Sequence, residues 1–166
     1  MRRRHKQARR GKYCMRRKGR ETLIEQDTVK LLRECDAGVR MGTDSIHGVL
    51  EFVSAQPLRD ALRSCEQEHR QLGREIRSAL QRFGDDGKAP NPIAEKMSWL
   101  KSSVKLALHE SDHTIADLMT DGCNMGVKSL SRYLNQYAAA DEDSKAIAGR
   151  LIRLEEKLSE DMRAYL

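Results

Sequence analysis

Apolar side chains recur every three or four positions between residues 58 and 83, and no other feature of the sequence constrains the fold as strongly. This spacing places them on one face of an α-helix. The members of the face are Leu58, Leu62, Cys65, His69, Leu72, Ile76, Ala79 and Phe83. Pro57 suits the first turn of such a helix, and Gly84 suits its end. The segment is therefore predicted to be an amphipathic helix, with His69 as the one polar side chain in its apolar face.

Other segments show the same amphipathic pattern. Long helices are expected over residues 28–53, 114–137 and 141–165, and a shorter one over residues 93–108. Asp27 is expected to cap the first of these, and Ser111 or Asp112 the helix that begins at residue 114. The sequence predicts an all-α fold, a four-helix bundle of two helical hairpins with a crossover helix between helices 2 and 3.

Composition agrees with a helical protein. Aromatic residues make up 4% of the chain and it contains three prolines, which disfavours a β-sandwich or barrel. No apolar run approaches the roughly 20 residues of a membrane-spanning helix, so we expect a soluble, cytoplasmic protein without a membrane span. The four cysteines form no C-x-x-C pair, and Cys35, Cys65 and Cys123 lie in apolar stripes. Buried, reduced thiols are expected at these three positions.

Charge divides the chain into two parts. Residues 1–20 contain eleven Lys or Arg and no acid, whereas residues 21–166 contain 20 basic and 25 acidic side chains. Residues 1–20 are expected to be a disordered basic tail, and residues 21–166 the four-helix bundle. A tail of this kind is expected to bind nucleic acid or another polyanion. The arginines predicted to contact the polyanion are Arg2, Arg3, Arg4, Arg9, Arg10, Arg16 and Arg17. Alternatively the protein starts at Met15, the first residues are an upstream extension, and nucleic acid is not a partner.

The chain contains an internal repeat. A shift of 84 positions aligns two copies of the pattern G-x-x-M-G-x-x-S-[IL]-x-x-x-L, which begin at Gly38 and Gly122. Small residues at helical spacing allow two helices to approach closely, so the two copies are predicted to face each other near a pseudo-twofold axis. The residues expected to pack there are Gly38, Gly42, Ser45, Gly122, Gly126 and Ser129.

Several stretches resemble a known group of proteins. Residues 27–36, 90–92, 120–126, 128–130 and 133–137 are similar to short bacterial four-helix-bundle proteins of unknown function in the ferritin-like superfamily. The resemblance covers roughly residues 25–166 and does not include the basic tail. It implies a bundle of paired hairpins with a long connection between the second and third helices, and it implies no activity.

Two Glu-x-x-His spacings match the pattern that dimetal carboxylate bundles use for their ligands. On a helical wheel His69 lies in the apolar face and Glu66 lies close beside it, so this pair can face the interior. Glu110 and His113 point away from Ile115, which marks the inward side of their helix. The second pair is therefore predicted to face outward.

A complete dimetal site would need more inward ligands than the sequence offers. The last helix has no Glu-x-x-His, and the first helix of each hairpin has Gly and Ser where inward Glu residues would be needed. Glu66 and His69, helped by Asp44 or His47, are the remaining candidates for iron or another transition metal. The pattern favours no cofactor, with His69 as a core histidine hydrogen-bonded to a neighbour.

Three functions are compatible with these features. The favoured one is a non-catalytic association or structural protein that binds itself or a protein partner. The second is a diverged ferritin-like metal-binding or oxidative-stress protein, and the third is a nucleic-acid-binding protein that uses the basic tail. No catalytic residue is predicted, because the chain contains neither a G-x-S-x-G turn nor a Gly-rich phosphate loop.

Overall fold

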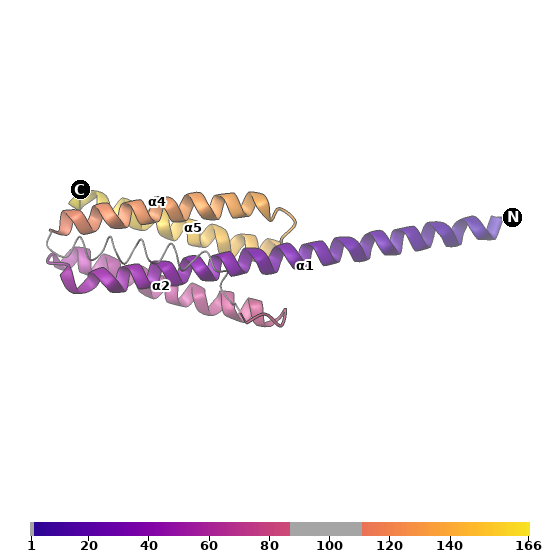
Figure 1. Ribbon diagram of the computed structural model, residues 1–166, viewed down its shortest axis with the longest axis horizontal. Coiled ribbons are helices and arrows are strands. Elements are labelled where there is room, and N and C mark those ends of the chain that lie inside the picture. The colour runs from indigo at the N-terminus through magenta and orange to yellow at the C-terminus, as the bar shows by residue number, and fades with distance from the viewer. Residues whose placement is uncertain (1, 87–110) are drawn as a thin grey trace.

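The computed structural model describes the backbone of residues 2–86 and 111–166, and the side chains of residues 21–86 and 111–166. Within these ranges it contains four α-helices, two short 3-10 turns and no strand. The helices are α1 (Arg2–Val49), α2 (Gln56–Gln81), α4 (Asp112–Gln136) and α5 (Glu142–Met162), and the turns are Leu50–Phe52 and Arg163–Tyr165. None of the described helices is long and apolar enough to cross a membrane. The prediction of an all-α bundle is confirmed (Figure 1).

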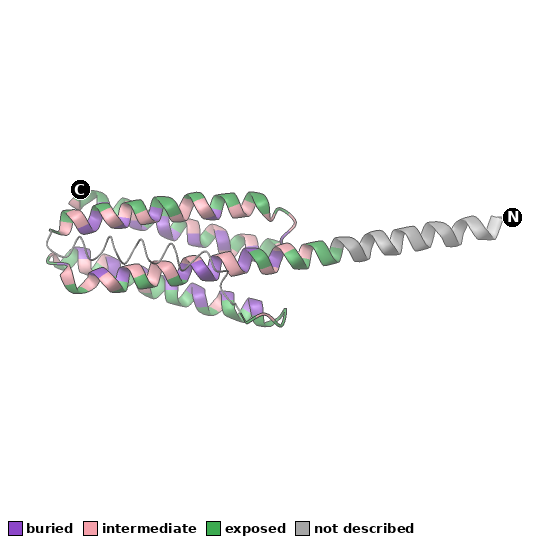
Figure 2. Cartoon of the chain, viewed as in Figure 1, coloured by how far each residue is buried: buried purple, intermediate pink, exposed green. Residues whose placement is uncertain are grey.

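Two antiparallel hairpins make up the bundle, one from α1 and α2 and one from α4 and α5 (Figure 1). They pack together through contacts of α2 with α5 and of α1 with both α4 and α5. All four helices contribute buried residues to one hydrophobic core, and Figure 2 marks the buried residues in purple along each helix. The predicted apolar face of α2 is buried along its length except at Phe83, which is 36% exposed because it follows the last residue of α2, Gln81.

The start of α1 differs from the prediction. The helix does not begin at Asp27 but extends back to Arg2, and the Asp27 carboxylate instead accepts a hydrogen bond from the backbone N–H of Ala139 at 3.2 Å. Residues 2–20 thus have a helical backbone where disorder was expected, because Arg, Lys, Gln and Ala are all good helix formers. The division into a basic tail of residues 1–20 and a bundle of residues 21–166 stays a prediction.

The start of α4 lies close to its predicted position and is fixed by a tertiary contact. The Asp112 carboxylate accepts hydrogen bonds from the backbone N–H groups of Ser54 at 2.7 Å and Ala55 at 2.8 Å. The first residues of α4 are thereby held at the junction between α1 and α2. The helix predicted over residues 93–108, like Glu110, lies outside the described residues.

A different anchor lies at the other end of the bundle. The guanidinium of Arg33 on α1 forms an ion pair with Asp85, which follows α2, and its Nε donates to Asp85 Oδ1 at 3.1 Å. Arg33 lies 16 residues before Val49, the last residue of α1, which is about 24 Å at the helical rise of 1.5 Å per residue, and Ser54 lies beyond that end. The described residues on the two sides of the gap, 86 and 111, therefore lie at opposite ends of the bundle.

Candidate functional site between the two hairpins

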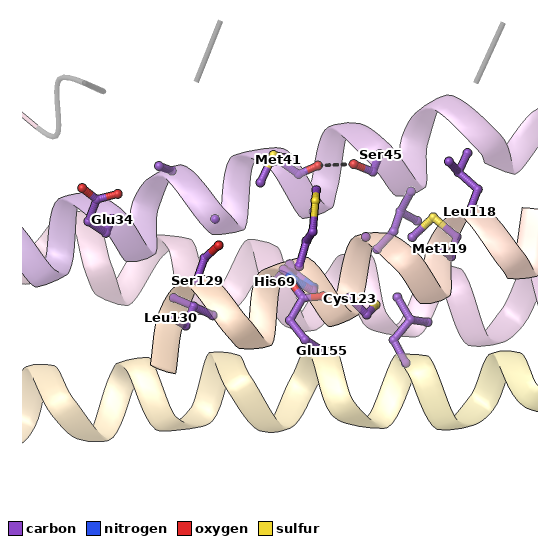
Figure 3. A pocket seen from close by; sticks show the side chains of 18 of the residues that line it. Glu34, Met41, Ser45, His69, Leu118, Met119, Cys123, Ser129, Leu130 and Glu155 are labelled. Atoms are coloured by element: carbon purple, nitrogen blue, oxygen red, sulfur yellow. Dashed lines mark hydrogen bonds and ion pairs between the residues drawn. The ribbon is translucent and has the colours of Figure 1, made fainter. Parts of the chain in front are cut away.

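The two copies of the repeat line one cavity between α1 and α4. Its volume is about 140 Å³, and side chains from all four helices surround it (Figure 3). The lining includes all six predicted packing residues, Gly38, Gly42, Ser45, Gly122, Gly126 and Ser129. The structure therefore brings the two copies together across a cavity.

The closest neighbours of the two central glycines are polar side chains. A Cβ on Gly42 would lie 2.8 Å from His69 Nε2, and a Cβ on Gly126 would lie 3.2 Å from Glu155 Cδ. Each glycine thus makes room for a side chain of the other helix in its own hairpin. The outer glycines are less crowded, because a Cβ on Gly38 would lie 3.5 Å from Leu151 and one on Gly122 would meet no described atom within 4 Å.

His69 and Glu155 form a buried pair that joins the hairpins (Figure 3). His69 is fully buried; its Nδ1 lies 2.9 Å from the carbonyl oxygen of Cys65, and its Nε2 lies 3.2 Å from Glu155 Oε1. The carbonyl can only accept, so Nδ1 donates to it. The pair therefore links α2 of one hairpin to α5 of the other through Nε2.

The protonation of His69 follows from these contacts. Burial by itself would lower the pKa of His69, but its contacts with the Cys65 side chain, whose Sγ lies 3.4 Å from Nδ1, and with Glu155 outweigh burial and raise the pKa to about 10. The ring is therefore an imidazolium at neutral pH, and its charge is paired with the Glu155 carboxylate inside the bundle. Both ring nitrogens of His69 have hydrogen-bond partners, so the contacts of His69 hold α2 against α5. His69 is thus the hydrogen-bonded core histidine that the sequence favoured.

Two of the buried cysteines, Cys35 and Cys123, are protonated thiols. Cys35, Cys65 and Cys123 are buried and form no disulfide, as predicted. Burial raises the pKa of Cys35 to about 12, and burial together with the Glu155 carboxylate raises the pKa of Cys123. Thiolate is the reactive form of cysteine, so neither of these two thiols is activated as a nucleophile.

The structure does not bring Glu66 and His69 together as ligands. Glu66 Oε1 accepts a hydrogen bond from Arg70 at 2.6 Å and lies 3.9 Å from Nδ1 of the exposed His47. Asp44 is exposed as well. Over residues 21–86 and 111–166, no group of three or more His, Cys, Asp or Glu side chains could hold a metal ion. Within these described ranges, the ligand set of the dimetal centre in ferritin-like bundles is therefore not assembled.

The outward direction predicted for His113 is confirmed. Its side chain is exposed, and its Nδ1 lies 3.2 Å from the carbonyl oxygen of Tyr165 at the end of the chain. Ile115, taken as the inward residue of this helix, is buried.

Sequence reasoning missed Glu155. Its position was available, because it lies four residues after Leu151 and three before Leu158, both in the apolar face of α5. A carboxylate at that spacing points into the bundle. The sequence does not show which side chain Glu155 binds, because its partner His69 is 86 positions away.

The candidate polyanion-binding residues lie in the N-terminal part of α1, which extends beyond the rest of the bundle (Figure 1).

Comparison with known protein families, with curated protein sequences and with solved structures finds no match to this chain.

Proposed function

We propose that this protein is a ferritin-like bundle that acts by association and not by catalysis. The order and directions of the helices support the fold, because two antiparallel hairpins pack side by side. Asp85 and Asp112 are anchored toward opposite ends of α1, which supports the proposal of a connection between the hairpins that runs the length of the bundle. A lengthwise connection between the second and third bundle helices is the ferritin-like arrangement.

The contacts of the chemically active side chains support a non-catalytic role. His69 and Glu155 bind each other, and Glu66 binds Arg70. These groups hold helices in register, and a catalytic acid, base or ligand would instead need a free position toward a substrate. The same contacts count against the metal-binding alternative.

The partner in this proposal is nucleic acid, bound by the N-terminal part of α1. One observation carries this choice: α1 is a single helix from Arg2 to Val49, and it presents the segment with eleven Lys or Arg away from the bundle (Figure 1). Residues 2–20 extend about 28 Å at the helical rise. Residues 21–166 carry more acids than bases, so the bundle repels phosphates and binding is confined to the extension.

The test compares two matched triple variants in binding to a short labelled DNA duplex. Arg2, Arg3 and Arg4 are replaced by Gln in one protein, and the exposed bundle residues Arg63, Arg74 and Arg153 in the other. The proposal predicts that the first variant binds at least about tenfold more weakly at low salt and has a shallower salt dependence, because fewer counterions are released. The second variant should bind like the unmodified protein. Equal binding by all three proteins would contradict the proposal.

A further inference from the structure

The ion pair between His69 and Glu155 places opposite charges next to two different cysteines. Cys65 Sγ on α2 lies 3.4 Å from Nδ1 of the His69 imidazolium. The thiol of Cys123 on α4 instead faces the other half of the pair, and burial together with the Glu155 carboxylate raises its pKa. A neighbouring cation favours the thiolate form of cysteine, and a neighbouring anion disfavours it. The pair therefore favours a thiolate at Cys65 and opposes one at Cys123.

Cys35 resembles Cys123 and not Cys65. Burial, followed by the carboxylates of Glu34 and Asp36, raises the pKa of Cys35 to about 12. The imidazolium beside Cys65 acts in the opposite direction from the burial and the carboxylates that shift the other two. Cys65 is thus the cysteine of the bundle interior whose contacts suit it to react.

Cys65 also lines a small cavity between α2 and α5, and the side chains of Lys157 and Asp161 give this cavity a polar wall. Its volume is about 120 Å³, which is room for several water molecules. Cys65 is 5% exposed, compared with 0% for Cys35 and 2% for Cys123. In the described part of the chain, a reagent as small and polar as hydrogen peroxide can therefore lie next to Cys65.

We infer that Cys65 is a modification site for small hydroperoxides, held in its reactive form by the His69 imidazolium. The thiolate sulfur attacks one oxygen of hydrogen peroxide, and the S–O bond forms as the O–O bond breaks. The hydroxide that leaves takes up the proton that the thiol released, so the products are a sulfenic acid at Cys65 and water. The sulfur loses two electrons and the peroxide gains them. The reaction is stoichiometric and independent of nucleic-acid binding.

The first test uses the unmodified chain and hydrogen peroxide at neutral pH. After a short exposure, catalase removes the peroxide and the protein is unfolded in urea with dimedone, which traps sulfenic acid wherever it has formed. Peptide mass spectrometry then compares Cys35, Cys65 and Cys123 in one sample. Cys65 should be labelled at least about tenfold faster than either of the others. Labelling of Cys65 no faster than that of Cys35 or Cys123 would overturn the inference.

The second test asks whether the reagent reaches Cys65 through the cavity. Cumene hydroperoxide is too bulky for a space of about 120 Å³, so in the folded protein it should oxidise Cys65 at least about tenfold more slowly than hydrogen peroxide does. Each rate is divided by the rate in urea-unfolded protein, which corrects for the intrinsic reactivity of the two reagents. Equal corrected rates would show that Cys65 reacts only when the bundle opens, and would contradict the site.

The third test isolates the imidazolium. His69→Gln/Glu155→Gln replaces both charges with neutral amides, so that neither charge is left buried without a partner, and oxidation of Cys65 should slow at least about tenfold. Glu75→Gln/Arg150→Gln is the matched control, because it removes another ion pair between α2 and α5, one that is exposed and does not line the cavity. The control should react like the unmodified protein. Equal rates in all three proteins would contradict the role of His69.

Discussion

The two copies of the repeat have the same sequence pattern but accommodate different side chains. Gly42 lies against His69 and Gly126 lies against Glu155, in each case a residue of the other helix in the same hairpin. The two side chains then meet each other at the middle of the bundle. The repeat thus supplies two equivalent spaces, and the chain fills one with a base and the other with an acid. Two equivalent spaces thus hold an asymmetric ionic contact that links the two hairpins.

The largest effect is expected when one half of this contact is removed. His69→Leu or Glu155→Leu alone leaves the other charge buried without its partner, and each should lower the free energy of unfolding by about 3 kcal/mol. The double variant His69→Leu/Glu155→Leu should be more stable than either single variant. Urea denaturation of the four proteins measures this. Strictly additive losses would show that the two side chains do not act as a pair.

A smaller effect is expected at the glycines, and it should be unequal. Gly42→Leu forces Cβ against the ring of His69, whereas Gly126→Leu meets the more flexible Glu155 at a longer distance. Gly42→Leu should therefore lower the free energy of unfolding by more than about 2 kcal/mol, with a smaller loss for Gly126→Leu. Thermal melts compare the two variants directly. An unchanged Tm in both would rule out close contact at the repeat.

The smallest effect, counted as the change in the free energy of unfolding per pH unit, is expected from a change of pH. The folded pKa of His69, about 10, is above the unfolded value of about 6.5. The stabilisation from His69 is therefore fully present below about pH 6.5 and is lost as pH rises toward 10, by at most about 1.4 kcal/mol per pH unit. Glu155→Gln should reduce this slope, whereas His47→Gln, at an exposed histidine, should leave it unchanged. Equal slopes in all three proteins would contradict the assignment to His69.

The sequence was sufficient to predict properties that depend on a single helix, and insufficient to predict properties that depend on how two helices pack together. The spacing within residues 58–79 identified the buried face of α2, including His69, because burial follows from helical period. Asp27 has the chemistry of a helix cap, yet it binds the backbone of Ala139. The pairing of His69 with Glu155 joins separate hairpins, and no local pattern encodes it. The crossover and the ferritin-like relationship are likewise long-range features and stay proposals.

The most direct test of the central claim is the titration of His69 by NMR, with its ring nitrogens observed in the intact protein. A charged His69 bound to Glu155 should keep protons on both nitrogens through neutral pH and titrate near pH 10. A neutral ring at pH 7, with a midpoint at or below about 6.5, would show that the two hairpins are not joined by an ionic pair.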